Sequence, residues 1–241
     1  FNPATANVGA NSIQYTYGPA NCRSEGSFSI TVLPATPVMV GNDITICNNQ
    51  PDITLDFTPR GGAWRGNGIV DSLQGIFSPQ QAGAGAQILT YRYVEPSNGC
   101  VTTARKTIQV APVPTVNIAE ATVSFCLFDG NIILPEELNV QVSPTGGTNN
   151  WTGTGITNAA QGIFNNNNLN LGTYPILYTY TSPAGCVASD SLIIQVIPKP
   201  QATAQMDTTV CISIGNLTLQ AAPIGGQWSG SQINTNSGLV N

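Results

Sequence analysis

The fold can be inferred from the stretch Gly61-Gly62-Ala63-Trp64-Arg65-Gly66-Asn67-Gly68-Ile69, because the chain repeats it. A tryptophan between glycines is followed by Gly-x-Phe, a Tyr-x-Tyr segment, Gly-Cys and an Ile-x-Val segment. This order occurs twice in full and in part at each end of the chain, and its tryptophans are Trp64, Trp151 and Trp228. A repeat of this length and order predicts several small domains of one type.

The spacing within the repeat is regular. The Phe of each Gly-x-Phe element, and the equivalent Phe1, stands 14 residues before the first tyrosine of its copy; these residues are Phe1, Phe77 and Phe164. The same three residues set a period of 76 to 87 residues. That period is too long for one turn of a solenoid and suits one small β domain per repeat.

The local signals favour β-strands. Segments 88–93 and 176–180 are rich in β-branched and aromatic residues, and the two tyrosines of each lie two apart, on one face of a strand. Segments 101–110 and 187–196 are expected to form the last strand of each copy. Short strands separated by Gly, Pro and Asn-Gly turns predict an all-β fold of tandem immunoglobulin-like β-sandwich repeats in a rod-like array. No amphipathic helix is expected.

Proline-rich segments divide the chain at 33–37, 111–114 and 197–200, where prolines favour short, extended connectors. The expected domains are a C-terminal part of a repeat at 1–33, whole repeats at 34–111 and 112–197, and an N-terminal part of a repeat at 198–241. No secretion signal opens the chain, so we expect a mature piece or a fragment.

The composition of the 241 residues excludes several classes of protein. Only 8% of residues are charged, and 7 Lys and Arg face 12 Asp and Glu, giving a net charge of −5. Nucleic-acid binding depends on cationic side chains and is not expected. The absence of histidine excludes His-based catalysis and His metal sites. No acid–base or nucleophile constellation stands out, so we expect no enzyme, cofactor or metal. No apolar run reaches the length of a membrane span.

The repeated tryptophan has two interpretations. Exposed tryptophans bind sugars by stacking, so the element could mark a ligand site. We favour a core tryptophan with glycines turning the chain tightly around it, because the element recurs at a fixed distance from the tyrosine segment. The tyrosine pairs are interpreted in the same way, as core residues.

The six cysteines recur at two positions of the repeat, and their even number favours an oxidising, extracellular setting. Pairing within each domain would give Cys47–Cys100 and Cys126–Cys186. Pairing of neighbours along the chain would give Cys22–Cys47, Cys100–Cys126 and Cys186–Cys211, whose separations of 25, 26 and 25 residues are more uniform. Spacing alone does not decide between the two.

One domain visibly differs from its neighbour. The second whole copy carries extra residues, and segment 128–138 is expected to be an exposed loop. Because loops often carry specific contacts, this segment is the candidate for recognition of a glycan or a protein.

The order of the motifs resembles the tandem immunoglobulin-like repeats of giant Bacteroidota surface proteins, which include SprB-type gliding-motility adhesins exported by the type IX secretion system. It is also similar to PKD-like modules, which share an Asn-Gly-Cys before the last strand. Here that element is Asn98-Gly99-Cys100, while Ala184-Gly185-Cys186 departs at its first residue. The resemblance covers essentially the whole chain.

The resemblance implies a non-enzymatic stalk or filament segment, extracellular and attached to the outer membrane. Its partners would be other repeats of the same chain, a substratum glycan or surface protein, and the secretion and gliding machinery. It favours the pairing within domains, Cys47–Cys100 and Cys126–Cys186. Such bacteria glycosylate Asp-(Ser/Thr)-apolar sites, and the matching residues are Ser72, Ser191 and Thr208.

Overall fold

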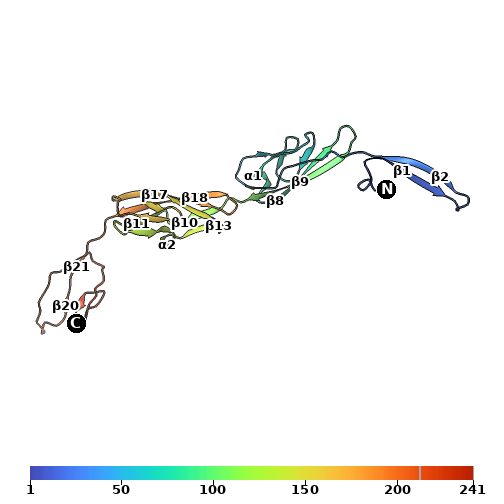
Figure 1. Ribbon diagram of the computed structural model, residues 1–241. Coiled ribbons are helices and arrows are strands. Elements are labelled where there is room, and N and C mark those ends of the chain that lie inside the picture. The colour runs from blue at the N-terminus through green and yellow to red at the C-terminus, as the bar shows by residue number, and fades with distance from the viewer. Residues whose placement is uncertain (212, 241) are drawn as a thin grey trace. The chain divides into compact units, whose positions relative to one another are not determined.

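A computed structural model describes residues 1–211 and 213–240, and nearly all of its regular structure is β-strand (Figure 1). Two sets of strands each form a four-stranded sheet and a three-stranded sheet. We call these sets the first and the second sandwich. They confirm the predicted fold class of tandem β-sandwich repeats. The two helices among the described residues are single turns of four residues, too short to form an amphipathic face.

The first sandwich pairs its strands in the orders β3-β9-β8-β5 and β4-β7-β6. Its elements are β3 (Ile44–Cys47), β4 (Ile53–Thr54), β5 (Ala63–Arg65), β6 (Ile69–Asp71), β7 (Ile76–Phe77), α1 (Pro79–Ala82), β8 (Gly85–Val94) and β9 (Val101–Ala111). Strand β3 runs parallel to β9 with Cys47 opposite Ala111, whereas β8 and β9 form an antiparallel hairpin.

The second sandwich repeats this arrangement in the orders β11-β18-β17-β14 and β12-β16-β15, and β10 pairs with β13 beside them. Its elements are β10 (Thr115–Ile118), β11 (Thr122–Cys126), β12 (Asn131–Ile133), α2 (Leu134–Glu137), β13 (Val140–Ser143), β14 (Thr148–Thr152), β15 (Ile156–Asn158), β16 (Ile163–Asn165), β17 (Gly172–Thr181) and β18 (Val187–Ile197). The first strand of the four-stranded sheet is again parallel to the last, with Cys126 opposite Ile197.

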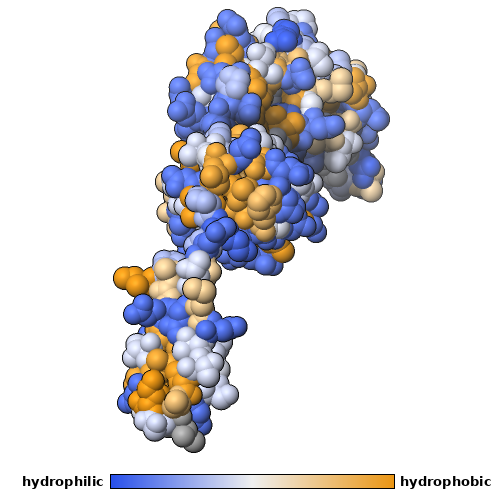
Figure 2. All heavy atoms as spheres, turned by 90° about the vertical axis from the view of Figure 1, so that its left-hand side faces the viewer, coloured by the Kyte–Doolittle hydropathy of each residue, from blue (hydrophilic) through white to orange (hydrophobic). Residues whose placement is uncertain are grey.

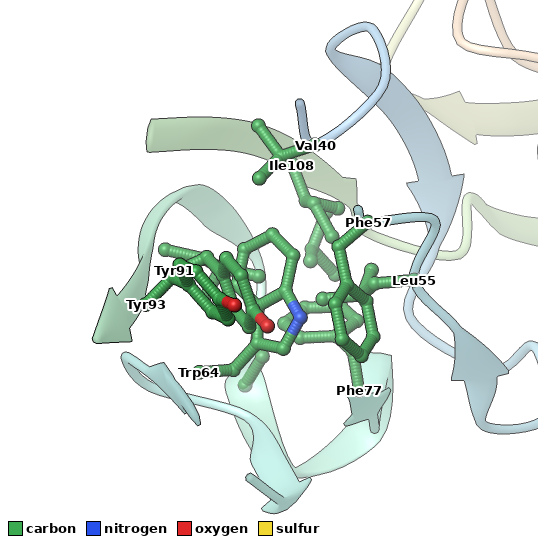
Figure 3. Close-up of a cluster of buried hydrophobic side chains, with 11 residues drawn as sticks. Val40, Leu55, Phe57, Trp64, Phe77, Tyr91, Tyr93 and Ile108 are labelled. Carbon is green, nitrogen blue, oxygen red and sulfur yellow. The ribbon is translucent and has the colours of Figure 1, made fainter. Parts of the chain in front are cut away.

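The alternation of side chains along β8 builds the core of the first sandwich. Leu89, Tyr91 and Tyr93 are buried, while Ile88 is exposed to solvent, as expected for a strand with one face on the core. Trp64 is only 1% exposed. Its ring centroid lies 5.3 Å from that of Tyr91, and Figure 3 shows both rings packed among the other buried side chains. Trp151 is equally buried, so the interpretation of these two residues as core tryptophans is confirmed.

The remaining strands lie near the two ends of the chain. Strands β1 (Gly9–Tyr17) and β2 (Ser24–Val32) form an antiparallel hairpin and pair with no other described strand. Beyond residue 198, β19 (Thr203–Ala204) pairs with β21 (Ala221–Ala222), and β20 (Leu217–Thr218) pairs with β22 (Leu239–Val240).

One set of backbone hydrogen bonds recurs in all three tryptophan-bearing copies. The N–H of each tryptophan donates to a carbonyl seven or eight residues later, with N···O distances of 2.8 Å; the acceptors are Ser72, Ala159 and Thr235. A leucine N–H before each tryptophan donates to the carbonyl of a later glycine; the pairs are Leu55–Gly75, Leu134–Gly162 and Leu219–Gly238. Residues 213–240 therefore share these backbone hydrogen bonds with the first part of each sandwich.

The glycine of each Gly-x-Phe or equivalent element must lack a side chain. Gly75 has a φ of +71°, and a Cβ atom there would lie 2.9 Å from Nε1 of Trp64. Gly162 and Gly238 have the same relationship to Trp151 and Trp228, at 2.7 and 2.6 Å. The repeated glycine is thus fixed by the repeated indole.

Backbone proximity divides the chain into two compact units. One comprises 1–118, 140–150 and 178–190, and the other 119–139, 151–177 and 191–241. This division does not coincide with the domain boundaries expected at 33, 111 and 197, which remain predictions. It does place Cys47 and the turn that carries Cys186 in the same unit.

Candidate functional site: the cystine and the cysteine positions

The structure contains one disulfide within its described residues, between Cys47 and Cys186. The two Cα atoms are 5.7 Å apart, within the range that disulfides require, although 139 residues separate the cysteines in sequence. Cys47 ends β3 of the first sandwich, and Cys186 lies in the turn between β17 and β18 of the second. The bond therefore joins a strand of one repeat to the hairpin turn of the next.

The early cysteine of each repeat lies beside the end of that repeat's last strand. Cys47 pairs in register with Ala111, and the next residue, Asn48, donates its N–H to the Ala111 carbonyl at 2.9 Å. Cys126 pairs with Ile197, and Leu127 donates to the Ile197 carbonyl at 2.8 Å. The parallel pairing fixes this position in both sandwiches.

The later cysteine of each repeat lies at the opposite end of the last strand. Cys100 immediately precedes β9, and its carbonyl accepts a hydrogen bond from the Glu95 N–H at 2.9 Å. Cys186 immediately precedes β18, and its carbonyl accepts from the Ser182 N–H at 2.8 Å. Both cysteines close the hairpin turn with the same backbone bond.

This geometry overturns the predicted pairings. Strand β9 has 11 residues, so the two ends of the strand lie roughly 33 Å apart at a rise of about 3.3 Å per residue. A bond between Cys47 and Cys100 would have to cross that distance, and the same argument applies to Cys126 and Cys186 along β18. The alternative of neighbouring pairs is also wrong, because Cys47 and Cys186 bond to each other and Cys22, Cys100, Cys126 and Cys211 carry no disulfide.

Local hydrogen bonds hold Cys126 in its position. Its N–H donates to Oδ2 of Asp129 at 2.9 Å, and its carbonyl accepts from Nδ2 of the buried Asn166 at 2.6 Å. Cys126 is half-buried. The strand end is therefore ordered although its sulfur has no bonded partner among the described residues.

Polar contacts tie the first hairpin turn to the preceding connector. The Thr36 hydroxyl donates to Oε2 of Glu95, and Nδ2 of Asn98 donates to the Pro34 carbonyl at 3.4 Å. The hydrogen bond from Thr36 lowers the pKa of Glu95 below its usual value, and bonds from Ser97 act in the same direction. The carboxylate form of Glu95 is thus favoured where the connector meets the turn.

A tyrosine hydroxyl forms hydrogen bonds with the loop that precedes each buried tryptophan. We call this loop the glycine loop, because it contains Gly61-Gly62 in the first sandwich and Gly146-Gly147 in the second. In the first sandwich the Tyr91 hydroxyl accepts from the Gly62 N–H and donates to the Pro59 carbonyl, both at 2.7 Å. In the second, Tyr180 bonds to Gly147 and to the Pro144 carbonyl, at 2.8 and 2.6 Å. In the sequence Tyr91 aligns with Tyr178. Because β14 is two residues longer than β5, the glycine loop lies two residues further along the neighbouring strand, and Tyr180 contacts it instead of Tyr178.

The predicted exposed loop at 128–138 is largely regular structure. It contains β12 and α2, and its leucines are buried: Leu134 is fully inaccessible and Leu138 is 3% exposed. Most of the other residues of the segment are exposed, and among them Phe128 is 65% exposed with a φ of +64°. Beside α2 lies a hollow of about 360 Å³ lined by Ile133, Pro135, Glu136, Ala160, Gln161 and Ile163.

The three predicted glycosylation residues lie on the surface. Ser72 is exposed between β6 and β7, Ser191 is exposed on β18, and Thr208 is exposed before β20. The structure does not bring them together, and their modification remains a prediction. Within residues 1–211 and 213–240, no helix is long and apolar enough to cross a membrane. The same residues contain no group of three or more acidic or cysteine side chains arranged to hold a metal ion.

No protein-family model matches the chain, and no curated protein has a similar sequence. Among solved structures, fibronectin(III)-like modules of CbhA from Clostridium thermocellum match 66% of this chain and 94% of their own, with 14% identity and a TM-score of 0.36. A Ca²⁺-stabilized adhesin of an Antarctic bacterium that binds ice matches 81% of this chain with 14% identity and a TM-score of 0.35, and N-cadherin EC1-4 of Drosophila matches 72% with 13% identity and a TM-score of 0.33. The chain spans 58% and 52% of the lengths of these last two structures.

The bonded pair could not be found from cysteine spacing alone. The missing information was the parallel pairing of β3 with β9, which shows that the two cysteines of one repeat lie at opposite ends of a strand. The sequence indicates a strand at this position only through the short apolar segment that precedes each early cysteine. That run does not specify which strand it joins, nor in which direction.

Proposed function

We propose that this chain is a structural segment of an extracellular adhesin, in which tandem β-sandwiches transmit tension and the cystine limits their extension. The observation that carries the proposal is the Cys47–Cys186 bond, which joins a strand of one repeat to the hairpin turn of the next. A bond within one domain would stabilise that domain alone. A bond from one repeat to the next gives the chain a covalent path that bypasses the strands between the two cysteines.

The path has a clear mechanical consequence. When the ends of the chain are pulled apart, tension passes from Cys47 through the two sulfur atoms to Cys186. The residues between them lie in a closed loop and bear no end-to-end load, and both tryptophan cores, around Trp64 and Trp151, lie inside it. The strands between the two cysteines are therefore shielded from end-to-end tension, whereas β18, which follows Cys186, stays in the load path.

The resemblance of the motif order to Bacteroidota surface repeats supports the finer proposal. On that basis the parent protein is a long adhesin attached to the outer membrane, exported by the type IX system and used in gliding or surface attachment. The low content of charged residues and the exposure of Ser72, Ser191 and Thr208 suit a glycosylated extracellular surface. The partners proposed are neighbouring repeats, a substratum glycan or protein, and the gliding machinery.

A second candidate function is recognition by the segment 128–138. The observation that favours it is the exposed ring of Phe128, which lies in a segment that the first sandwich lacks. Under this alternative, Phe128→Ala abolishes attachment to the substratum while leaving the tension response unchanged. Leu134→Ala is not suitable for this test, because Leu134 is part of the core.

Single-molecule extension tests the main proposal. The chain is tethered at its two ends and pulled with and without a reductant. The separation of 139 residues corresponds to about 490 Å of extended chain at roughly 3.5 Å per residue. We expect the reduced chain to gain that additional length and the oxidised chain to lack it. Equal lengths in the two conditions would overturn the proposal.

Matched variants isolate the bond. Cys186→Ser should give the long extension without reductant, because Cys47 has lost its partner. Cys100→Ser occupies the equivalent turn of the first sandwich, where the structure has no disulfide. It should behave like the unmodified chain, and a long oxidised trace from this variant would contradict the assigned pairing.

A further inference from the structure

Three of the five arginines of the chain lie on one face of the four-stranded sheet of the first sandwich. Arg65 of β5 pairs with Thr90 of β8, and Thr90 pairs on its other side with Arg105 of β9, the strand beside β8 in Figure 1. Residues opposite each other in neighbouring strands share a face, and so do residues two apart along one strand. Arg92 therefore lies on the same face, two residues beyond Thr90. We call Arg65, Arg92 and Arg105 the arginine patch.

The arginine patch faces solvent, and its members lie close together. All three arginines are exposed, whereas Tyr91, between Thr90 and Arg92, is buried in the core. Adjacent strands are about 4.8 Å apart, so the Cα atoms of Arg65 and Arg105 are separated by roughly 10 Å. Arg92 lies about 7 Å along β8 from Thr90. Three long side chains can therefore converge on one ligand.

No carboxylate neutralises the arginine patch. Figure 2 shows hydrophilic residues over much of the surface, but only 8% of all residues are charged and the net charge is −5. The outward-facing residues of β5, β8 and β9 include no Asp or Glu, and the three arginines have no ion-pair or hydrogen-bond partner among the described residues. Asp43 lies at the edge of the sheet, where its Oδ1 accepts from the Thr107 N–H at 2.7 Å. The patch is thus a local positive site on an acidic chain.

The second sandwich shows that the repeat folds without these arginines. The equivalent positions, 86 or 87 residues later, all carry hydroxyl groups; they are Thr152, Thr179 and Ser191. Threonine is enriched in strands, and like charges at neighbouring positions of a sheet destabilise it. Because the arginines add a repulsion that the fold does not require, the patch points to an anionic ligand.

The surroundings of the patch suit a sugar chain better than a nucleic acid. The hydroxyl groups of Thr90 and Thr103, on the same face, can donate to and accept from sugar hydroxyls. Ile88, also on this face, is 63% exposed and offers an apolar contact to the C–H groups of a sugar ring. Binding of single-stranded nucleic acid relies on aromatic side chains that stack on the bases. The aromatic residues of β5, β8 and β9 are all buried in the core.

We propose that the arginine patch binds a carboxylated polysaccharide, a chain of sugars that includes uronic acids. The planar guanidinium group donates two parallel N–H bonds to a carboxylate, which the ammonium group of lysine does not. The outward face of β5, β8 and β9 carries arginine and no lysine, in agreement with such pairing. The inference rests on the proposed extracellular role and names both the class of glycan and the surface that binds it. Binding here is separate from the transmission of tension through the cystine.

Binding to immobilised polygalacturonate tests the proposal. The whole oxidised chain is passed over this surface and over neutral dextran, dextran sulfate and single-stranded DNA, and binding is followed by surface plasmon resonance. We expect saturable binding to polygalacturonate and none to neutral dextran. The affinity should fall as the salt concentration rises, because salt screens exposed charges. A chain that does not bind polygalacturonate, or that binds only dextran sulfate or DNA, would overturn the proposal.

Matched variants locate the site. Arg65→Thr/Arg92→Thr introduces the residues of the second sandwich and should lower the affinity for polygalacturonate at least about tenfold, because two charge-assisted contacts are lost. Arg23→Ser/Lys199→Ser also removes two exposed positive charges, but away from the patch, and should leave the affinity unchanged. Equal losses in the two double variants would show that net charge, and not the patch, attracts the glycan.

A charge-conserving variant tests the geometry of the contact. Arg105→Lys keeps the positive charge on the same face but loses the planar pair of donors, so the affinity should fall. An unchanged affinity would overturn the assigned pairing with carboxylates. Urea denaturation of each variant confirms that it is folded. The extension test of the Cys47–Cys186 bond is independent of these outcomes, since all the variants retain both cysteines.

Discussion

Cys47 lies opposite Ala111 in the parallel register of β3 and β9, at the far end of β9 from Cys100. This relationship directs the early cysteine of one repeat away from its own hairpin turn. The turn cysteine of the next repeat, Cys186, lies within bonding distance instead. The contribution of this bond to stability can be measured separately from that of the packing around the repeated tryptophan.

Removal of the cystine should destabilise the chain. A disulfide that closes a long loop contributes about 2–4 kcal/mol, so Cys47→Ser should lower the free energy of unfolding by roughly that amount. Urea denaturation followed by tryptophan fluorescence measures the change. Cys126→Ser, at the equivalent strand end of the second sandwich, is the control and should change the stability of the single chain by less than about 0.5 kcal/mol. Equal losses in the two variants would show that the bond is not the cause.

Removal of the buried Tyr91 hydroxyl should lower the stability of the chain more than removal of an exposed tyrosine hydroxyl. Tyr91→Phe leaves the buried N–H of Gly62 without its acceptor, which costs about 1–3 kcal/mol. Tyr180→Phe should also destabilise the chain, since Gly147 loses the same kind of bond in a less buried position. Tyr17→Phe changes an exposed side chain and should be close to neutral. Urea denaturation compares the three variants, and a neutral Tyr91→Phe would contradict the assigned role of the hydroxyl.

A side chain at Gly75 should be poorly tolerated. A Cβ atom there would lie 2.8 Å from Cε1 of Phe57 and 2.9 Å from Nε1 of Trp64. Gly99 has a similar φ, +73° against +71°, but a Cβ atom at Gly99 would meet nothing within 4 Å. Gly75→Ala should therefore lose about 1–3 kcal/mol more than Gly99→Ala, since overpacking adds to the backbone strain. Thermal unfolding of both variants separates the two effects, because Gly99→Ala introduces backbone strain without overpacking. Equal losses of stability would show that contact with the indole ring has no effect.

Protonation of Glu95 should weaken the fold in acid. Its folded pKa is lowered, chiefly by the hydrogen bond from Thr36. The contribution of the Glu95 carboxylate to the stability of the fold is therefore complete above the pKa of Glu95 in the unfolded state. It is lost as the pH falls through the pKa of Glu95 in the folded state. Thr36→Val should raise the pKa of Glu95 toward its ordinary value, which an NMR titration of the side-chain carboxyl measures. An unchanged pKa in Thr36→Val would exclude Thr36 as the main cause.

The sequence is informative wherever a signal is local. Alternating burial along β8 and β17 follows from the two-residue period of a strand, and the repeated spacing of Gly-x-Phe and Trp correctly predicts the core. The prediction of a loop at 128–138 is wrong because the segment contains β12 and α2, although most of its residues are exposed as expected. The segment is too short for its pattern to show that Leu134 and Leu138 face inward. The sequence also does not show that Tyr180, and not the aligned Tyr178, takes the role of Tyr91 at the glycine loop. That change follows from two additional residues in β14.

The repeat, the strands, and the burial of Trp64 and Trp151 can all be predicted from the sequence, because each depends on side chains a few residues apart or on a fixed period. The partner of Cys47 depends on the tertiary structure. Ile44 and Ile108, 64 residues apart, must pair in parallel before Cys47 is positioned, and the bonded Cys186 belongs to the next repeat. No local pattern encodes that choice, because the direction and register of pairing between distant strands are set by how whole sheets assemble.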